Sequence, residues 1–397
     1  MQKKKVLIVI ESLVCAGAEK SLISFLSTLD YNRFEVDLQL FKYGGEFEQF
    51  LPKEVRLLPP FEYTQFIEKN VIQQFLTLDI PKLKARWGYS MAIRQGQTFH
   101  VDKARLYWTH IAPCLPTPEK KYDVAIGYAQ GLPTFYVAEK VNASIKMSWV
   151  NVSYRLTGIN KEFQEKFYAN MDHIVTVSDS AYTVFQEVYP QFASKMLVIW
   201  DMLDATFIDK LSKVPTETGM SKQVPCLLTI ARLNKPQKGY DISLEACKIL
   251  KERGIAFKWY AIGRGPYKEE MEQFIEANHL QDTFILLGTT SNPYPYIKDC
   301  TLYVQTSRHE GYGLSIAEAR ILNRPVVTTE FDAVYNQMVP EKNGLVVKQD
   351  PVAVADAIER LLKDKELYNS IVAYQQQEKK GNQEEIEKFY QLLDVSS

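Results

Sequence analysis

The sequence predicts an α/β protein made of two Rossmann-like, doubly wound parallel-sheet domains. Short apolar, β-branched runs alternate with longer helical patterns, beginning with VLIVI at 6–10, AEKSLISFLSTL at 18–29 and FEVDLQLF at 34–41. This alternation is typical of βαβ units, whose strands are buried on both faces of a parallel sheet. At 397 residues the chain also exceeds the size of most single domains, so we expect two.

The strands and helices fall into two series. Later strands of the first series are YDVAIGY at 122–128, IKMSWV at 145–150 and HIVTVS at 173–178. A polar stretch with two prolines, KLSKVPTETGMSKQVP, has no periodicity and is typical of a linker. We therefore expect an N-terminal domain at 1–209, a linker at 210–225, a C-terminal domain at 226–377 and a closing helix at 378–397.

Composition excludes several classes of protein. Hydrophobic residues make up 46% and charged residues 24% of the chain, as in ordinary globular proteins rather than disordered or fibrous ones. A formal net charge of -1 gives no overall attraction to polyanions, so no nucleic-acid partner is expected. Five cysteines without a C-x-x-C pair argue against a disulfide framework and fit a reducing cytoplasm.

The N-terminal stretch MQKKKVLIVIESLVC resembles the start of a signal peptide. Its apolar run from Val6 to Ile10 is only five residues long, and Glu11 interrupts it. We therefore expect a buried first strand instead. No apolar run approaches the ~20 residues that a membrane-spanning helix needs, so we expect a cytoplasmic protein.

No metal site is expected. The sequence has no HExxH motif, no Walker lysine loop and no GxGxxG, and its five histidines lack ligand spacing. It also lacks D-x-D, the acidic pair with which many nucleotide-sugar enzymes hold a metal against a diphosphate. The candidates for chemistry are therefore turns at the carboxyl ends of strands, where ligands collect and helix N-termini favour anions.

Two such turns have features that suit a phosphate. Gly17 follows the first strand, and a glycine there would let backbone N–H groups approach a phosphate, although packing alone also explains one glycine. In RLNKPQKG, Arg232 and Lys238 precede a helix whose N-terminus already favours anions. An anionic ligand would offset the unfavourable interaction between these two cations and the positive end of the helix dipole. Two solvated surface cations are the alternative.

The stretch RHEGYGLSIAEA places two carboxylates around a glycine loop. Glu310 is expected in the loop and Glu318 in the first turn of the next helix. Glu310 suits hydrogen bonds to hydroxyl groups, with a solvated loop carboxylate as the alternative, and N–H groups near Gly313 and Leu314 suit a phosphate. For Glu318 the alternative is a capping box with Ser315.

The element EGYGLSIAE resembles the E-x7-E motif of retaining glycosyltransferases with the GT-B fold, specifically glycosyltransferase family 4 (group 1 glycosyl transferases). AGAEKSL, TIARLNKPQKG and RPVVTT resemble further elements of that family in its usual order, so the resemblance covers nearly the whole chain. It implies two domains facing a central cleft, a closing helix that returns to the first domain, and a nucleotide-sugar co-substrate used without a metal or other cofactor.

The resemblance also implies roles for individual residues. Arg232, Lys238 and Glu310 would be the catalytic residues, the two cations on the donor diphosphate and Glu310 on the transferred sugar. Further donor ligands would be Glu318 for the ribose, Gly17, Gly313 and Leu314 for phosphate or sugar, and Leu287, Gly288 and Tyr294 for the nucleobase. In the acceptor or sugar pocket the family usually has a histidine. This chain has Asn151, which cannot become cationic near neutral pH.

The implied function is retaining, metal-independent transfer of a sugar from a UDP-sugar to a glycan or lipid-linked acceptor, in the biosynthesis of a cell-surface polysaccharide such as a capsule or exopolysaccharide. Guanosine is the alternative base. One alternative is that the chain is a non-catalytic GT-B subunit that supports a partner transferase. The presence of Asn151 in place of the usual histidine is the observation that suggests it. The other is a nucleotide-sugar 2-epimerase, which the residues around Glu310 and Glu318 fit poorly.

The segment from Phe66 to Pro116 departs from the α/β pattern. It interleaves cations with aromatic residues, namely Lys82, Lys84, Arg86, Arg94, Lys103 and Arg105 with Trp87, Tyr89, Tyr107 and Trp108. Such a mixture suits a bilayer interface or an anionic partner, and of these we expect peripheral contact with the inner face of the cell membrane. A solvated helical face with extended cations is the alternative.

Overall fold

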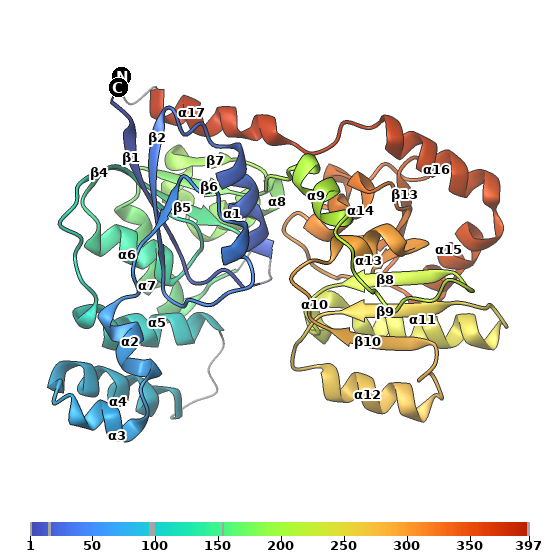
Figure 1. Ribbon diagram of the computed structural model, residues 1–397, viewed down its shortest axis with the longest axis horizontal. Coiled ribbons are helices and arrows are strands. Elements are labelled where there is room, and N and C mark those ends of the chain that lie inside the picture. The colour runs from blue at the N-terminus through green and yellow to red at the C-terminus, as the bar shows by residue number, and fades with distance from the viewer. Residues whose placement is uncertain (1, 15–16, 95–99, 153–154, 395–397) are drawn as a thin grey trace. The chain divides into compact units, whose positions relative to one another are not determined.

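The computed structural model describes residues 2–14, 17–94, 100–152 and 155–394 (Figure 1). The chain forms two compact units, unit 1 (Met1–Met202 with Glu384–Ser397) and unit 2 (Leu203–Gln383). Residues 203–225, which include the predicted linker, belong to unit 2. Each unit has its own parallel sheet, which confirms the predicted pair of α/β domains.

Unit 1 contains a seven-stranded sheet in the order β3-β2-β1-β4-β5-β6-β7, with every pair parallel. Its strands are β1 (Lys4–Ile10), β2 (Phe34–Leu40), β3 (Val55–Leu57), β4 (Tyr122–Gly127), β5 (Ala143–Val150), β6 (His173–Thr176) and β7 (Met196–Val198). β1 is buried from Val6 to Ile10, as expected for a central strand covered on both faces. The strand order reverses between β1 and β4.

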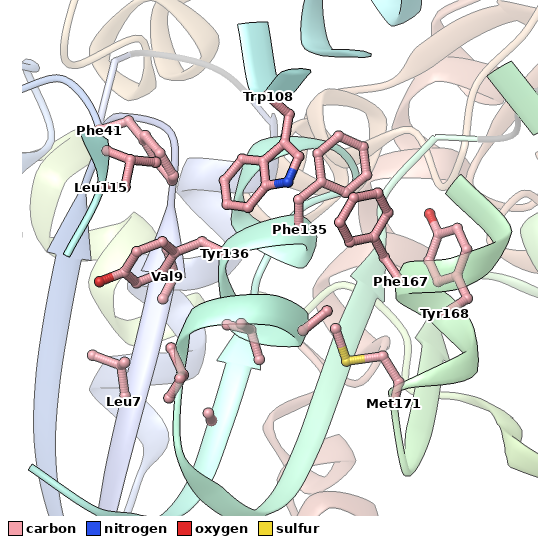
Figure 2. Close-up of a cluster of buried hydrophobic side chains, with 14 of the residues drawn as sticks. Leu7, Val9, Phe41, Trp108, Leu115, Phe135, Tyr136, Phe167, Tyr168 and Met171 are labelled. Atoms are coloured by element: carbon pink, nitrogen blue, oxygen red, sulfur yellow. The ribbon is translucent and has the colours of Figure 1, made fainter. Parts of the chain in front are cut away.

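The helices of unit 1 are α1 (Gly17–Thr28), α2 (Glu62–Glu68), α3 (Val71–Leu76), α4 (Ile80–Arg94), α5 (His100–Ile111), α6 (Leu132–Lys140), α7 (Gly158–Ala169), α8 (Asp179–Val188) and α17 (Ile386–Asp394). One core cluster joins α5, α6 and α7 through their aromatic side chains (Figure 2). Phe135 stacks on Phe167 with ring centroids 4.1 Å apart, and Trp108 meets Phe135 edge-on at 5.8 Å. Trp108 is therefore a core residue, which contradicts the prediction that it contacts a membrane.

The closing helix α17 belongs to unit 1 and covers α1 and β2. Phe389 packs edge-on against Phe25 at 5.1 Å between ring centroids, and Tyr390 stacks on Phe34 at 5.7 Å. The Lys4 Nζ donates to the Leu393 carbonyl at 3.0 Å. The C-terminal segment is thus part of the core of unit 1 (Figure 1).

Unit 2 contains a six-stranded parallel sheet in the order β10-β9-β8-β11-β12-β13. Its strands are β8 (Cys226–Ile230), β9 (Lys258–Ile262), β10 (Phe284–Gly288), β11 (Leu302–Gln305), β12 (Val326–Thr329) and β13 (Gly344–Val347). Its helices are α9 (Ala205–Ser212), α10 (Lys235–Lys238), α11 (Tyr240–Glu252), α12 (Lys268–Ala277), α13 (Tyr294–Asp299), α14 (Leu314–Ile321), α15 (Pro351–Lys363) and α16 (Lys365–Gln377). Here the order reverses between β8 and β11.

Local sequence sets the ends of several helices. The Asp350 carboxylate accepts a hydrogen bond from the Ala353 N–H at 2.9 Å, and Pro351 occupies the first helical position, where its missing N–H costs nothing. Asp364 caps α16 in the same way. No helix in the described residues combines the length and the apolarity needed to cross a membrane.

Candidate functional site

In unit 2 the predicted catalytic residues meet where the strand order reverses. Arg232 and Lys238 follow β8, and Glu310 follows β11, the neighbouring strand. At such a reversal the helices after the two strands lie on opposite faces of the sheet and leave a crevice at the carboxyl ends. The topology therefore brings together residues that are far apart in the sequence.

Lys238 and Glu310 form an ion pair. The Lys238 Nζ donates to Glu310 Oε2 at 2.6 Å, and the two side chains are 12% and 11% exposed. Glu310 Oε1 also accepts hydrogen bonds from Ser307 Oγ at 2.6 Å and from Gln305 Nε2 at 2.8 Å. Glu310 is thus not a solvated loop carboxylate, because three partners fix its position. Sequence reasoning missed Gln305 and Ser307, although both lie at the end of β11.

Arg232 has a different environment. Its side chain is exposed, and Nη2 donates to Gln237 Oε1 at 3.3 Å. Within the part of the chain that the structure describes, no carboxylate forms an ion pair with Arg232. Arg232 therefore presents a guanidinium to solvent at the turn that also carries Lys238, and this group is available to an anion.

Gly239 lets the turn after β8 approach the end of β11. Its φ is +61°, and a Cβ at this position would lie 2.0 Å from the Thr306 carbonyl oxygen. The Thr306 hydroxyl donates to the Gly239 carbonyl at 2.9 Å. Only glycine fits this backbone conformation and this contact. The close approach places Lys238 beside the Glu310 loop.

The capping box considered for Glu318 is absent. α14 begins at Leu314, its N-cap residue is Gly313 with φ +86°, and no side chain caps the helix. Ser315 is already inside the helix, so its hydroxyl is not at the N-cap position that a capping box requires. Glu318 is instead fully buried, and its Oε1 accepts a hydrogen bond from the Tyr294 hydroxyl at 3.1 Å.

Gln337 holds the loop between β11 and α14. Its Nε2 donates to the Tyr312 carbonyl and, at 3.2 Å, to the Gly313 carbonyl. These two hydrogen bonds anchor the loop directly before α14, whose first N–H groups have no partner in the preceding turn of the helix. Sequence reasoning missed Gln337, which no local motif marks.

The predicted nucleobase residues Leu287 and Gly288 end β10, an edge strand. Gly288 has φ +76° and open space where a Cβ would be, and its carbonyl accepts from the Gly263 N–H at 2.7 Å. Their role remains a prediction. In the described residues no group of three or more His, Cys, Asp or Glu side chains is placed to hold a metal ion.

Unit 1 has a pocket at its own reversal point, between β1 and β4. Its volume is about 150 Å³, and its lining includes Glu11 after β1, Gln130 and Gly131 after β4, and Asn151 after β5. Gly131 precedes α6 with φ +84°, a conformation that favours glycine. The predicted residue Asn151 therefore lies in a pocket. Glu11 and Gln130 were missed, although each stands directly beyond a strand.

Asn151 has one satisfied and one unsatisfied polar atom. Its Nδ2 donates to the Tyr128 carbonyl at 2.9 Å, while its buried Oδ1 has no hydrogen-bond partner among the described residues. A buried acceptor without a partner costs about 1–3 kcal/mol, and a hydroxyl donor in the pocket would remove that cost. Gly17 is the first residue of α1, and Ala16 before it lies outside the described residues.

Comparison with known proteins shows a family match over the second half of the chain. Residues 213–378 match the family described as Glycosyl transferases group 1. The poly(ribitol-phosphate) alpha-N-acetylglucosaminyltransferase of Staphylococcus aureus is 33% identical over 131 residues, which are 32% of this chain and 26% of that protein. The putative colanic acid biosynthesis glycosyltransferase WcaL of Escherichia coli is 28% identical over 141 residues, 33% of this chain and 34% of that protein. The matches thus span about a quarter to a third of these relatives.

The fold extends over a greater length than the sequence match. Crystals of a mutant of Staphylococcus aureus TarM, in complex with Fondaparinux, alpha-GlcNAc-glycerol and UDP, contain a chain that superimposes with a TM-score of 0.69 at 16% identity. The match covers 98% of this chain and 99% of that chain. Two units that each contain a parallel sheet, as in this chain, make up the GT-B fold. Residues 213–378 of this chain are therefore similar to the group 1 glycosyl transferases, and the chain has the GT-B fold.

Proposed function

We propose that this protein is a glycosyltransferase that moves a sugar from a nucleotide-sugar donor to an acceptor hydroxyl. The observation that carries the proposal is the Lys238–Glu310 pair, 2.6 Å apart beside exposed Arg232 at the reversal point of a group 1 glycosyl transferase domain. The site combines cations for a diphosphate with an oriented carboxylate for sugar hydroxyls.

The chemistry follows from where charge develops. When the bond from the anomeric carbon to the diphosphate oxygen breaks, the sugar gains oxocarbenium character and the diphosphate gains negative charge. Arg232 and Lys238 would stabilise that charge, and each ~1.36 kcal/mol of selective stabilisation is tenfold in rate. Glu310, held by Ser307 and Gln305, would accept hydrogen bonds from sugar hydroxyls.

The finer properties of the reaction are part of the same proposal. We infer a UDP-sugar donor, which is supported by the UDP in the complex of TarM, a protein with the same fold. We infer transfer without a metal, since Arg232 and Lys238 would supply the positive charge that a diphosphate needs. Retention of anomeric configuration follows the resemblance of EGYGLSIAE to retaining enzymes. In that scheme the departing phosphate oxygen takes the acceptor proton, so no protein nucleophile is needed.

The acceptor is proposed to be a glycan or lipid-linked glycan of a cell-surface polysaccharide, built on the cytoplasmic side of the membrane. The names of the relatives support this, because one acts on poly(ribitol-phosphate) and another belongs to colanic acid biosynthesis. In unit 1 the unsatisfied Oδ1 of Asn151 can accept a hydrogen bond from an acceptor hydroxyl.

The test is incubation of the purified chain with a panel of UDP- and GDP-sugars, followed by chromatography of nucleotide and sugar. Without an acceptor, we expect slow hydrolysis that releases nucleotide and free sugar. With a glycan acceptor, nucleotide should be released faster and the sugar should appear on the acceptor. Interconversion of one nucleotide sugar into another would identify an epimerase. Binding of a nucleotide sugar without its turnover, whichever acceptor is added, would identify a non-catalytic subunit.

A further inference from the structure

Exposed apolar side chains gather in one segment of unit 1. Of the fourteen large hydrophobic side chains that are exposed in the described residues, eight lie between Val71 and Met91. They are Val71, Ile72, Phe75 and Leu76 on α3, Leu78 in the next turn, and Ile80, Trp87 and Met91 on α4. Figure 1 shows α3 and α4 at the end of unit 1 opposite α17. A cluster of this kind marks an interaction surface.

The outer face of α4 carries apolar and basic residues in one stripe. Ile80, Lys84, Trp87, Met91 and Arg94 are spaced by four, three, four and three positions, which places them on one side of the helix, and all five are exposed. The other side of α4 is used by the fold, since Ala85 is buried and Leu83 packs against the core. Packing against the core therefore accounts for the apolar residues on one side of α4, but not for those on its exposed side.

Leu78 adds an independent observation. It is 82% exposed, and its φ is +53°. A leucine in the left-handed region is strained, and a glycine or asparagine would relieve that strain. Strain of this kind persists where the residue serves a function, and this leucine presents its side chain to solvent between α3 and α4.

The charge around these side chains is positive. Between residues 62 and 94 there are five cations and three carboxylates, a net charge of +2, whereas the whole chain has -1. Two of those carboxylates, Glu62 and Asp79, are bound by Lys82 at 3.0 and 2.9 Å. Lys69, Lys84 and Arg94 are exposed and form no ion pair with any described carboxylate.

We propose that α3, the turn at Leu78 and the outer face of α4 dock this protein on a bilayer that contains anionic lipids. The apolar side chains would enter the acyl boundary, Trp87 would lie at the headgroup level, and Lys69, Lys84 and Arg94 would face lipid phosphates. A symmetric dimer through the same surface would bring these cations against their own copies, so the charge favours lipid over a second chain.

The docking surface differs from the one that the sequence indicates. Trp108 on α5 is 2% exposed and lies in the core, and Lys82 is held by two carboxylates. The membrane location itself rests on the proposed function. Vesicle binding needs no donor or acceptor, however, so failure of the docking surface and failure of catalysis are measured separately.

The test is co-sedimentation of the full chain with vesicles of phosphatidylcholine alone or of equal parts phosphatidylcholine and phosphatidylglycerol. We expect binding only to the anionic vesicles, and a loss of at least about tenfold in the double variant Leu76→Glu with Leu78→Glu. The pair Lys84→Ala with Arg94→Ala should lose about tenfold as well. Val352→Glu replaces a hydrophobic side chain that is 47% exposed on α15 and should bind like the parent.

Circular dichroism of each variant checks that the fold is kept. Equal binding to both kinds of vesicle, or parental binding by the Leu76→Glu and Leu78→Glu variant, would overturn the proposal. A dimer seen by sedimentation velocity in the parent and abolished in that variant would also overturn it, because the surface would then be occupied by a second copy.

Discussion

The Nζ of Lys238 lies 2.6 Å from Oε2 of Glu310, although 72 residues separate them along the chain. Both side chains are nearly buried, so each charge depends on the other for its stabilisation. An arriving diphosphate would compete with Glu310 for the ammonium group, and a sugar hydroxyl would compete with Lys238 for the carboxylate. The ion pair thus holds the ammonium and the carboxylate in position when no ligand is bound. When a ligand arrives, both groups can bind it instead.

Removing one member of this pair should therefore affect both stability and turnover. We expect Lys238→Ala to cost roughly 1–3 kcal/mol in the free energy of unfolding, because Glu310 then lacks its cation, and to cut turnover at least ~tenfold. The double variant Lys238→Met with Glu310→Gln should regain most of the stability but not the turnover. Denaturant unfolding and donor hydrolysis measure the two effects. Parental turnover by Lys238→Ala would show that its ammonium does not stabilise the diphosphate.

Arg232→Ala should separate turnover from stability. Its guanidinium is exposed and forms no ion pair with a described carboxylate, so its loss should leave the melting temperature unchanged. Turnover should fall at least ~tenfold if the guanidinium faces the diphosphate. Lys235→Ala is the matched control, since Lys235 is an exposed cation of the same turn, over the ring of Tyr267. Equal losses in the two variants would point to a general charge effect.

The sequence predicts the sheets well because buried parallel strands require continuous apolar runs. It also predicts that Arg232, Lys238 and Glu310 lie at the ends of strands. It does not predict that Lys238 pairs with Glu310, because that depends on side-chain direction and on the contact between Gly239 and Thr306. The sequence pattern therefore predicts where in the fold a residue lies, but it does not predict which side chain that residue contacts.

The two predictions that the structure contradicts, for Glu318 and for Trp108, failed for the same physical reason. The S-x-x-E pattern was compatible with a capping box, yet Gly313 starts the helix earlier and leaves Glu318 to bind the Tyr294 hydroxyl. Trp108 shares a segment with many cations, yet its ring completes an aromatic core and its Nε1 donates to Glu139 at 3.0 Å. Composition within a segment does not say which face of a helix the fold covers.

Glu318→Gln should weaken nucleotide binding with little effect on stability. A glutamine keeps an oxygen that can accept from the Tyr294 hydroxyl, so the buried hydrogen bond survives. A carboxylate binds ribose hydroxyls more strongly than an amide does, so we expect about a tenfold rise in the Kd for nucleotide. Calorimetric titration and thermal melting measure the two effects. A lowered melting temperature with unchanged Kd would make Glu318 a purely structural residue.

Gly239→Ala should disrupt the site through the backbone. The new Cβ would lie 2.0 Å from the Thr306 carbonyl oxygen, so the turn after β8 must move and take Lys238 with it. Gly254→Ala is the control, because Gly254 has a similar φ of +72° but no atom within 4 Å of the added Cβ. The control should lose only about 1 kcal/mol of stability through its backbone conformation. Gly239→Ala should lose more stability and most of its turnover. Equal effects of the two substitutions would refute the role of the close approach.

Asp201 should make the stability of unit 1 depend on pH. Burial raises the pKa of its carboxyl from 3.8 to about 7, against the opposing effect of a hydrogen bond with Ser21. Between these two values the folded state binds a proton that the unfolded state has released. Stability therefore falls as pH rises through this window, by up to ~1.4 kcal/mol per pH unit, and levels off above the folded pKa.

Asp201→Asn should remove this slope. The amide is neutral at every pH, so the variant should match the parent near pH 4 and be more stable than the parent near pH 8. Urea unfolding of both proteins, followed by the tyrosine and tryptophan fluorescence of the chain across that range, measures the difference. Asp332→Asn is the control, since it makes the same substitution at an aspartate on the surface. If the parent and Asp201→Asn lose stability in parallel as pH rises, the carboxyl of Asp201 is ionised in the folded protein, and its burial is balanced by a cation or by water.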